Sequence, residues 1–254
     1  MRSISAIALA LGLVCAAPTL QARDWATIKQ TGTLIAATEG AYPPFNYFQG
    51  GKLTGYEVDV MEAIAKKLNL KLDWRTLGFD AQVAAIAQDR FDVAIASHGI
   101  TEERQKSVDF TLPHYCSGGQ IVAKPGGPLK AAELQGKTLG VQLATTYADA
   151  ARKVSGAKEV KTYPKDTDAQ QALLGGRIDA WVTDRFVAQT AVQKSGNKLK
   201  SGELLFVERV AMILRKGNPE LLGQLNQTLK DLNSDGTLKR ISEKYFKEDV
   251  TCLN

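Results

Sequence analysis

The sequence predicts an α/β fold of two lobes, each a sheet flanked by helices. Short β-rich runs alternate with amphipathic helices in two series, on either side of a turn-rich stretch at residues 113–119. This alternation favours parallel strands covered by helices. The length of 254 residues is compatible with one large domain or two small ones. A charged fraction of 23% with 44% apolar residues excludes a disordered chain and a multi-pass membrane protein.

The first 22 residues have the features of a secretory signal peptide. A positive start at Arg2 precedes an apolar run at residues 7–17, and the small residue Ala22 suits a signal peptidase. The apolar run is shorter than the roughly 17–25 residues of a membrane anchor. Bulky residues before Cys15 disfavour lipid attachment there. We therefore expect cleavage near Ala22 and a periplasmic or extracellular protein.

The first strand–helix series follows the signal peptide. Residues 34–38 form a β-rich run that ends at Gly40 and the turn prolines behind it. Met61, Ile64 and Leu68 recur at helical spacing. The predicted strands of this series are 34–38, 70–74 and 91–96, and its predicted helices are 57–68 and 81–88.

A second series follows a further strand at 120–123. Its predicted strands are 138–142, 159–162 and 179–182, and its predicted helices are 147–153, 167–174 and 185–194. Two more helices, 219–233 and 237–246, close the chain on either side of Gly236. The first of these carries a stripe of leucines, so we expect it to dock on a lobe.

Two cysteines remain once the signal peptide is removed. In an oxidising compartment Cys116 and Cys252 are a candidate disulfide. It would close a loop of well over a hundred residues, which the chain-entropy model values at about 4 kcal/mol. Two unpaired buried thiols are the alternative.

Charge and composition exclude several function classes. A net charge of +5 is mild, and basic residues are scattered among acids, so we expect no nucleic-acid partner. Two histidines and three cysteines leave little material for a zinc site or haem, and we expect neither a metal nor a cofactor. The chain has no nucleophile elbow, phosphate-binding glycine loop or zinc-protease motif. His98 and His114 are interpreted as ordinary structural or surface histidines.

The first lobe ends a predicted strand with residues that could bind an anion. Backbone groups of Ser97 and Gly99 lie where open α/β sheets place ligands, and Arg104 follows on a short helix. A guanidinium binds a carboxylate through two parallel charge-assisted hydrogen bonds. Arg104 could equally belong to a solvated helix face.

Equivalent positions in the second lobe carry an acid and two hydroxyls. Asp184 could accept an ammonium group or simply cap the helix behind it, and Thr145 and Thr146 could cap a helix or face a ligand. Tyr42 and Phe79 could be the apolar walls of a site or core aromatics.

Taken together, the segments resemble the family 3 extracellular solute-binding proteins, the polar amino-acid receptors of ABC importers. The matching segments follow the family's order along nearly all of the mature chain: T-E-G-A-Y-P-P-F-N-Y (38–47), G-K-L-T-G-Y-E-V-D-V (51–60), R-F-D-V-A-I-A-S-H-G-I-T-E-E-R (90–104), V-D-F-T (108–111), G-V-Q-L-A-T-T-Y (140–147), V-T-D (182–184) and D-G-T-L-K-R-I-S-E-K-Y-F (235–246). No single segment is decisive, but their joint order is specific.

The resemblance implies a periplasmic binding protein-like II fold that closes around its ligand by hinge bending. The first lobe would comprise residues 23–116 and 209–254, and the second residues 117–208. Two crossing strands near 115–119 and 206–211 would form the hinge. A monomer would deliver its ligand to a membrane permease.

The resemblance also implies roles for single residues. Arg104, helped by Ser97, Gly99, Thr145 and Thr146, would bind the α-carboxylate of an amino acid. Asp184 would receive the α-ammonium group. Tyr42 and Phe79 would sandwich the ligand side chain, and Glu39 would reach its distal end. These expectations make the ligand-binding set Glu39, Tyr42, Phe79, Ser97, Gly99, Arg104, Thr145, Thr146 and Asp184.

The sequence departs from the family pattern at several positions. Gly99 stands where relatives commonly have Ser or Thr, Ala144 replaces a frequent Gly, and His98 replaces an apolar residue. Because Glu39 places a carboxylate near the side-chain end, a polar or cationic amino acid is favoured over glutamate or aspartate.

Two other functions share this fold. Lyases of the cyclohexadienyl dehydratase type are similar, but there we expect a glutamate about one helical turn after Asp184, and this chain has Val187. A general acid needs a protonatable group, so no enzymatic activity is expected. The ligand-binding component of a sensor would have the same cleft and only a different partner.

Overall fold

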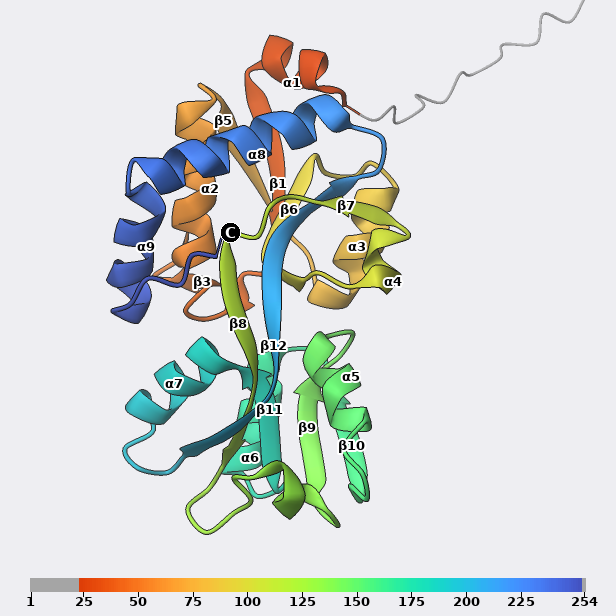
Figure 1. Cartoon of the computed structure of the whole chain (residues 1–254), viewed down its shortest axis with the longest axis vertical. Coiled ribbons are helices and arrows are strands. Elements are labelled where there is room, and N and C mark those ends of the chain that lie inside the picture. The colour runs from red at the N-terminus through yellow and green to blue at the C-terminus, as the bar shows by residue number, and fades with distance from the viewer. Residues whose placement is uncertain (1–22, 253–254) are drawn as a thin grey trace, which may run out of the picture.

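The computed structural model describes residues 23–252, and Figure 1 shows them as two groups of elements joined by two long strands. The predicted signal peptide and Cys15 lie outside the described residues. The joining strands are β8 (Tyr115–Ala123) and β12 (Lys200–Arg215). Across residues 23–252, no helix combines the length and apolar character needed to cross a bilayer.

The first lobe is centred on three parallel strands. Strand β1 pairs in parallel with β5 on one side and with β6 on the other. The chain elements of this lobe are α1 (Trp25–Thr31), β1 (Thr33–Thr38), α2 (Tyr56–Lys67), β5 (Lys71–Thr76), α3 (Phe79–Ala87), β6 (Val93–Gly99), α4 (Glu102–Gln105) and β7 (Val108–Phe110). Between β1 and α2, three short antiparallel strands form a second sheet: β2 (Ala41–Tyr42), β3 (Asn46–Gln49) and β4 (Lys52–Thr54).

The second lobe repeats the arrangement. Strand β9 pairs in parallel with β10 and β11, and β11 pairs antiparallel with β8. Its elements are the 3₁₀ turn η1 (Ala131–Leu134), β9 (Thr138–Gln142), α5 (Thr146–Arg152), β10 (Glu159–Tyr163), α6 (Asp166–Leu174), β11 (Ala180–Asp184) and α7 (Arg185–Lys194).

The two lobes share one hydrogen-bonded sheet. Among the described strands the order is β10-β9-β11-β8-β12-β6-β1-β5, with β7 also on β12. Strands β8 and β12 are antiparallel, and Gly119 lies opposite Phe206 while Tyr115 lies opposite Val210. Crossing strands were expected at these positions. The chain then returns to the first lobe as α8 (Pro219–Ser234) and α9 (Thr237–Phe246), both of which contact α2 (Figure 1).

Each predicted helix and strand is present, with shifted ends and some omissions. Strands β6 and β11 run on to Gly99 and Asp184, so these residues end strands instead of following them. The sequence reasoning missed α1, η1, β7 and the strands β2 to β4, which are short. It also missed the first part of β12, at residues 200–205, where exposed and half-buried residues are mixed and none is buried.

Apolar side chains from both lobes meet in the largest core cluster. It includes Ile64 and Leu225 of the first lobe and Trp181 of the second. Where the lobes meet, the Phe186 ring lies 4.6 Å from that of Phe246 and 6.4 Å from that of Phe45. Because these rings belong to different lobes, the contact stabilises the conformation in which the lobes touch.

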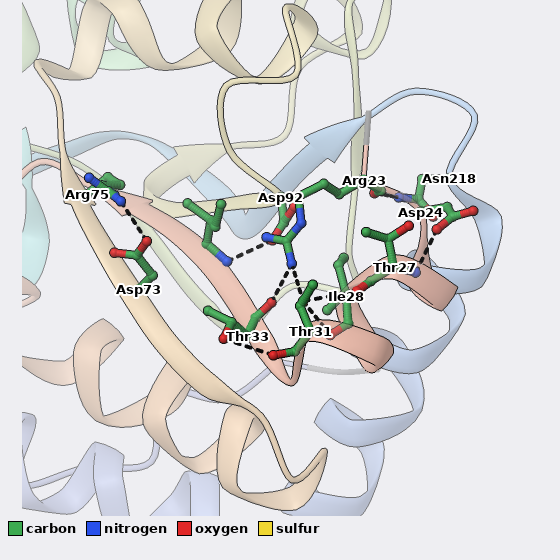
Figure 2. Close-up of polar contacts among 11 residues, drawn as sticks. Arg23, Asp24, Thr27, Ile28, Thr31, Thr33, Asp73, Arg75, Asp92 and Asn218 are labelled. Atoms are coloured by element: carbon green, nitrogen blue, oxygen red, sulfur yellow. Dashed lines mark hydrogen bonds and ion pairs between the residues drawn. The ribbon is translucent and has the colours of Figure 1, made fainter. Parts of the chain in front are cut away.

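The start of the described chain is fastened to the first lobe (Figure 2). Arg23 donates through Nη1 to Asp92 Oδ2 at 2.8 Å, and through Nη2 to the Thr33 carbonyl at 2.8 Å. The same Asp92 oxygen accepts from the Ile35 amide at 2.7 Å. Burial raises the pKa of Asp92, so the arginine and the amide offset a desolvation cost.

The end of the described chain is fastened to the hinge. Cys116 and Cys252 form a disulfide, with Cα atoms 5.6 Å apart, as the sequence reasoning allowed. The Cys116 amide also donates to the Val250 carbonyl at 3.0 Å. The beginning of β8 is therefore bound to the C-terminal tail covalently and by the backbone.

Candidate functional site

A small cavity between the lobes gathers most of the predicted site residues. Its free volume is about 10 Å³, roughly room for one water molecule. Its lining is Glu39, Tyr42, Phe79, Ala96, Ser97, Gln142, Thr145, Thr146 and Tyr147. Because both lobes contribute walls, the shape of this cavity depends on how far the lobes are closed. A larger hollow of about 1550 Å³ runs along β12 and α5, but of the predicted site residues only Thr146 borders it. The small cavity is therefore the candidate site.

Arg104 lies beside the cavity and links the lobes. It belongs to α4, where its amide donates to the capping hydroxyl of Thr101 at 3.2 Å. Its guanidinium donates through Nη1 to the Gly99 carbonyl and through Nη2 to the Ala144 carbonyl, both at 2.8 Å, and lies 5.4 Å from the Phe79 ring centre. Burial lowers the pKa of Arg104. A half-buried guanidinium whose hydrogen bonds go to neutral carbonyls is a site for an incoming anion.

Asp184 has one oxygen engaged in capping and one directed at the site. Its Oδ1 accepts from the Phe186 amide at 2.7 Å and from the Val187 amide at 3.4 Å, which caps α7. Its Oδ2 lies 3.3 Å from the hydroxyl of Tyr147, a cavity residue. Burial raises the pKa of this fully buried carboxyl to about 7. Capping and ligand contact, which the sequence left as alternatives, are therefore compatible.

Glu39 faces the second lobe across the cavity. Its Oε1 accepts from Gln142 Nε2 at 2.8 Å, a second direct bond between the lobes. Burial raises the pKa of Glu39 to about 7, although the bond from Gln142 works against this. A carboxyl group whose pKa lies near 7 can lose its proton and become charged when a cationic group binds beside it.

Aromatic rings form the walls of the cavity. Tyr42 stacks on Phe45 with ring centres 5.6 Å apart, and Phe79 stacks on His98 with centres 4.9 Å apart. Within the described residues neither ring nitrogen of His98 has a hydrogen-bond partner, and burial holds its pKa well below the usual value. A neutral His98 therefore acts as a flat backing for Phe79.

The two threonines differ in what their hydroxyls do. Thr145 Oγ1 donates to the Gln142 carbonyl at 2.7 Å and accepts from the Ala148 amide at 3.1 Å, so it caps α5. Thr146 Oγ1 instead donates to Glu208 Oε2 at 2.7 Å. Gly99 packs against Thr146, since a Cβ added at Gly99 would lie 3.1 Å from Thr146 Cγ2.

Ser97 is held by a buried carboxylate. Its backbone has φ of 60°, a left-handed conformation that residues other than glycine seldom adopt. Its amide, expected to face a carboxylate ligand, donates to Glu57 Oε1 at 2.7 Å. Glu57 also accepts from Asn46 Nδ2 at 2.7 Å, and His114 Nε2 lies 3.0 Å from it. Since Asn46 Oδ1 accepts from the Gly40 amide at 2.9 Å, one network fixes both cleft loops of the first lobe.

Several residues near the cavity escaped sequence reasoning. Gln142 and Tyr147 sit at the ends of a predicted strand and helix, where their contribution to a cleft could have been considered. Buried Asp166 accepts from Trp181 Nε1 and Thr183 Oγ1, both at 2.9 Å, and burial raises its pKa to about 7. Glu208 lies in β12, where no local pattern separated it from the other polar residues.

Comparison with known proteins agrees with this geometry. Residues 34–248 match the model of bacterial extracellular solute-binding proteins, family 3. The chain is 40% identical over 230 residues to the L-cystine-binding protein TcyJ of Escherichia coli K12, with 88% of this chain and 86% of TcyJ covered. A solved ancestral arginine-binding protein bound to arginine is 39% identical, with a TM-score of 0.80, 85% of this chain and 98% of that one covered.

A third relative bears on the enzyme alternative. The ancestral amino acid-binding protein AncCDT-1, a precursor of cyclohexadienyl dehydratase, is 31% identical, with a TM-score of 0.81, 86% of this chain and 97% of that one covered. It too is a binding protein by its description. The extent and consistency of these matches show that the chain belongs to the family 3 bacterial extracellular solute-binding proteins.

Proposed function

We propose that this protein captures an L-amino acid between its lobes and delivers it to an ABC transporter permease. The observation that carries the proposal is the cavity itself, in which an acid and two aromatic rings of the first lobe meet two threonines and a tyrosine of the second, beside Arg104 and Asp184. Arg104 would exchange its two carbonyl partners for the α-carboxylate, and Asp184 Oδ2 would accept from the α-ammonium group. Tyr42 and Phe79 would hold the side chain.

The charges around the cavity favour a polar or cationic ligand. Four carboxyl groups have a pKa that burial raises, namely Glu39, Asp166, Asp184 and Glu208. A ligand that brings positive charge relieves the repulsion among them, whereas glutamate or aspartate adds to it. L-arginine and L-cystine, named for relatives of this chain, are the first candidates.

Closure of the lobes would trap the ligand. Strands β8 and β12 would bend as the hinge, with lobe boundaries near residues 116 and 208. The bonds of Glu39 with Gln142 and of Arg104 with Ala144 link the lobes in the closed conformation. We further propose that the protein acts as a monomer in the periplasm or outside the cell, after signal cleavage near Ala22.

The lyase alternative lacks the glutamate expected in that branch of the fold. The position one turn after Asp184 holds Val187, which is 6% exposed and cannot exchange a proton. Binding without chemistry needs no such group. Turnover of prephenate by the purified protein would reverse this assignment.

A thermal-shift screen tests the proposal. The panel contains the twenty amino acids, ornithine, citrulline and cystine, applied to refolded protein free of co-purified ligand. A ligand at a hundred times its Kd stabilises by about 2.7 kcal/mol, or roughly 5–10 °C in Tm for a chain of this size. Arg104→Ala should abolish the shift, whereas Arg75→Ala, which removes an exposed partner of Asp73, should retain it. The proposal fails if no member of the panel shifts Tm.

A further inference from the structure

Glu208 of the hinge strand is a half-buried acid that contacts a residue of the candidate cavity and also borders the larger hollow. Glu208 belongs to β12, opposite Ser117 of β8. Its Oε2 accepts from Thr146 Oγ1 at 2.7 Å. A Cβ added at Gly99 would collide with the same oxygen. Gly99 therefore leaves the space that the Glu208 carboxylate occupies.

The second oxygen of Glu208 is available. Within residues 23–252, the buried Oε1 atom has no hydrogen-bond partner. A buried carboxylate oxygen without a donor is costly unless a donor arrives when the protein functions. Glu208 also lies close enough to raise the pKa of Asp184 and to oppose the lowering of the pKa of Arg104.

An ammonium group at Asp184 would need more than one acceptor. It carries three N–H donors. Asp184 Oδ1 is occupied by the amides of α7, which leaves only Oδ2 for the ligand. A second acceptor in the cleft would engage another of the three donors, and Glu208 Oε1 is buried and unpartnered next to the oxygen that binds Thr146.

We propose that Glu208 is a ligand-binding residue. Its carboxylate, which occupies the space left free by Gly99, accepts a hydrogen bond from the α-ammonium group together with Asp184. This inference rests on the proposed capture of an amino acid and adds a specificity determinant to it. Two acids around one ammonium group would make the site select strongly for a free α-amino group. A carboxylic acid that lacks this group would gain nothing from Glu208.

Paired titrations test the assignment. The tightest ligand from the amino-acid panel and its analogue without the α-amino group are titrated by calorimetry into wild type and Glu208→Gln. Glutamine keeps the shape and an acceptor for Thr146 but removes the charge. We expect Glu208→Gln to lower the affinity for the amino acid by about 10-fold or more and the affinity for the analogue by less than about 2-fold. The reason is that hydrogen bonds between charged groups are stronger than those between neutral ones.

Two further variants separate a direct contact from a structural effect. Glu203→Gln changes an exposed acid on the same strand, which accepts from the Ala131 amide at 3.0 Å, and should leave affinity unchanged. Gly99→Ala should displace the Glu208 carboxylate and weaken binding, with little further loss when combined with Glu208→Gln. Equal loss for amino acid and analogue, or no loss for either, overturns the role of Glu208 while leaving amino-acid binding intact. A wild-type protein that binds no amino acid overturns both.

Discussion

Replacing Asp184 by asparagine should move stability and affinity in opposite directions. The carboxylate caps α7 through Oδ1 and points Oδ2 toward the cavity residue Tyr147. Asparagine caps a helix about as well as aspartate, so the backbone of α7 should keep its partner. It cannot carry the negative charge that the α-ammonium group is proposed to contact.

The structure gives the expected sizes of the two effects. Burial raises the pKa of Asp184 to about 7 from an ordinary value of 3.8. An acid with a raised pKa stabilises the fold less as the pH rises from the ordinary to the raised value, because ionisation in the interior is costly. Asp184→Asn removes this cost and should be more stable than the ligand-free wild type at pH 8, by on the order of 2 kcal/mol. The gain should shrink as the pH falls toward 4.

Ligand affinity should fall at the same time. Loss of a hydrogen bond to a charged group weakens binding about 10- to 100-fold. In the wild type, affinity should rise with pH between about 6 and 8, as Asp184 and Glu39 ionise. The pH dependence should be smaller in the variant, where Asp184 no longer titrates.

Urea unfolding at pH 5 and 8 and calorimetric titration measure both quantities. Asp179→Asn is the matched control, because Asp179 is an exposed acid just before the other end of β11 and accepts from the Thr138 amide at 2.8 Å. Asp184→Ala additionally removes the cap and should be about 1 kcal/mol less stable than Asp184→Asn. The reasoning is refuted if Asp184→Asn binds as tightly as wild type, or if affinity and stability fall together.

Three other predictions concern the disulfide, the N-terminal anchor and the ligand's side chain. Joint replacement of Cys116 and Cys252 by serine should lower the free energy of unfolding by about 5 kcal/mol, because the bridge closes a loop of 136 residues. Reactive thiols in the denatured, unreduced wild type would contradict the bridge. Asp92→Ala should lower the free energy of unfolding, measured in urea, by about 3 kcal/mol. The Asp92 side chain is only 4% exposed, and its removal leaves a guanidinium and an amide without their acceptor. The control Asp73→Ala removes an acid that is 37% exposed and pairs with Arg75 (Figure 2), so it should lower the free energy of unfolding by less than about 1 kcal/mol. Equal losses for the two variants would refute the difference expected between a buried and an exposed pair. Glu39→Gln should lower the affinity for L-arginine at least about 10-fold relative to the affinity for a neutral amino acid in competition titrations. An unchanged ratio of the two affinities would show that Glu39 does not contact the ligand side chain.

Sequence patterns were sufficient for the elements with a strong period or sharp ends. The helix α2 was predicted because Met61 and Ile64 recur on one face, and both are fully buried. The strand β6 was predicted as an apolar run, but its end was placed too early, because Ser97 continues the strand with a left-handed backbone that no composition rule anticipates. The strands β2 to β4, of two to four residues, were missed, since so few positions define no period.

The candidate site divides in the same way. Arg104 and Asp184 could be proposed from the sequence because each comes soon after a predicted strand, at an edge where ligands bind, and Glu39 could be proposed from the resemblance to the family. Glu57 and Glu208 could not. Glu57 acts on Ser97 from forty positions away, and Glu208 meets Thr146 across sixty-two. Neither partner can be found without knowing how β6, α5 and β12 are arranged.

The sequence by itself determined the family, the two-lobed α/β fold, the expected export and the residue types available for binding an amino acid. These follow from local order along the chain, where apolar periods and turn residues act over a few positions. Only the tertiary structure decided which oxygen of Asp184 is free, why position 99 is a glycine, and how far burial raises the pKa of Glu39 and Asp184. Desolvation and collision depend on every atom within a few ångströms, and at Gly99 and Glu39 these atoms include Thr146, Glu208 and Gln142, from the other lobe or the strand that joins the lobes.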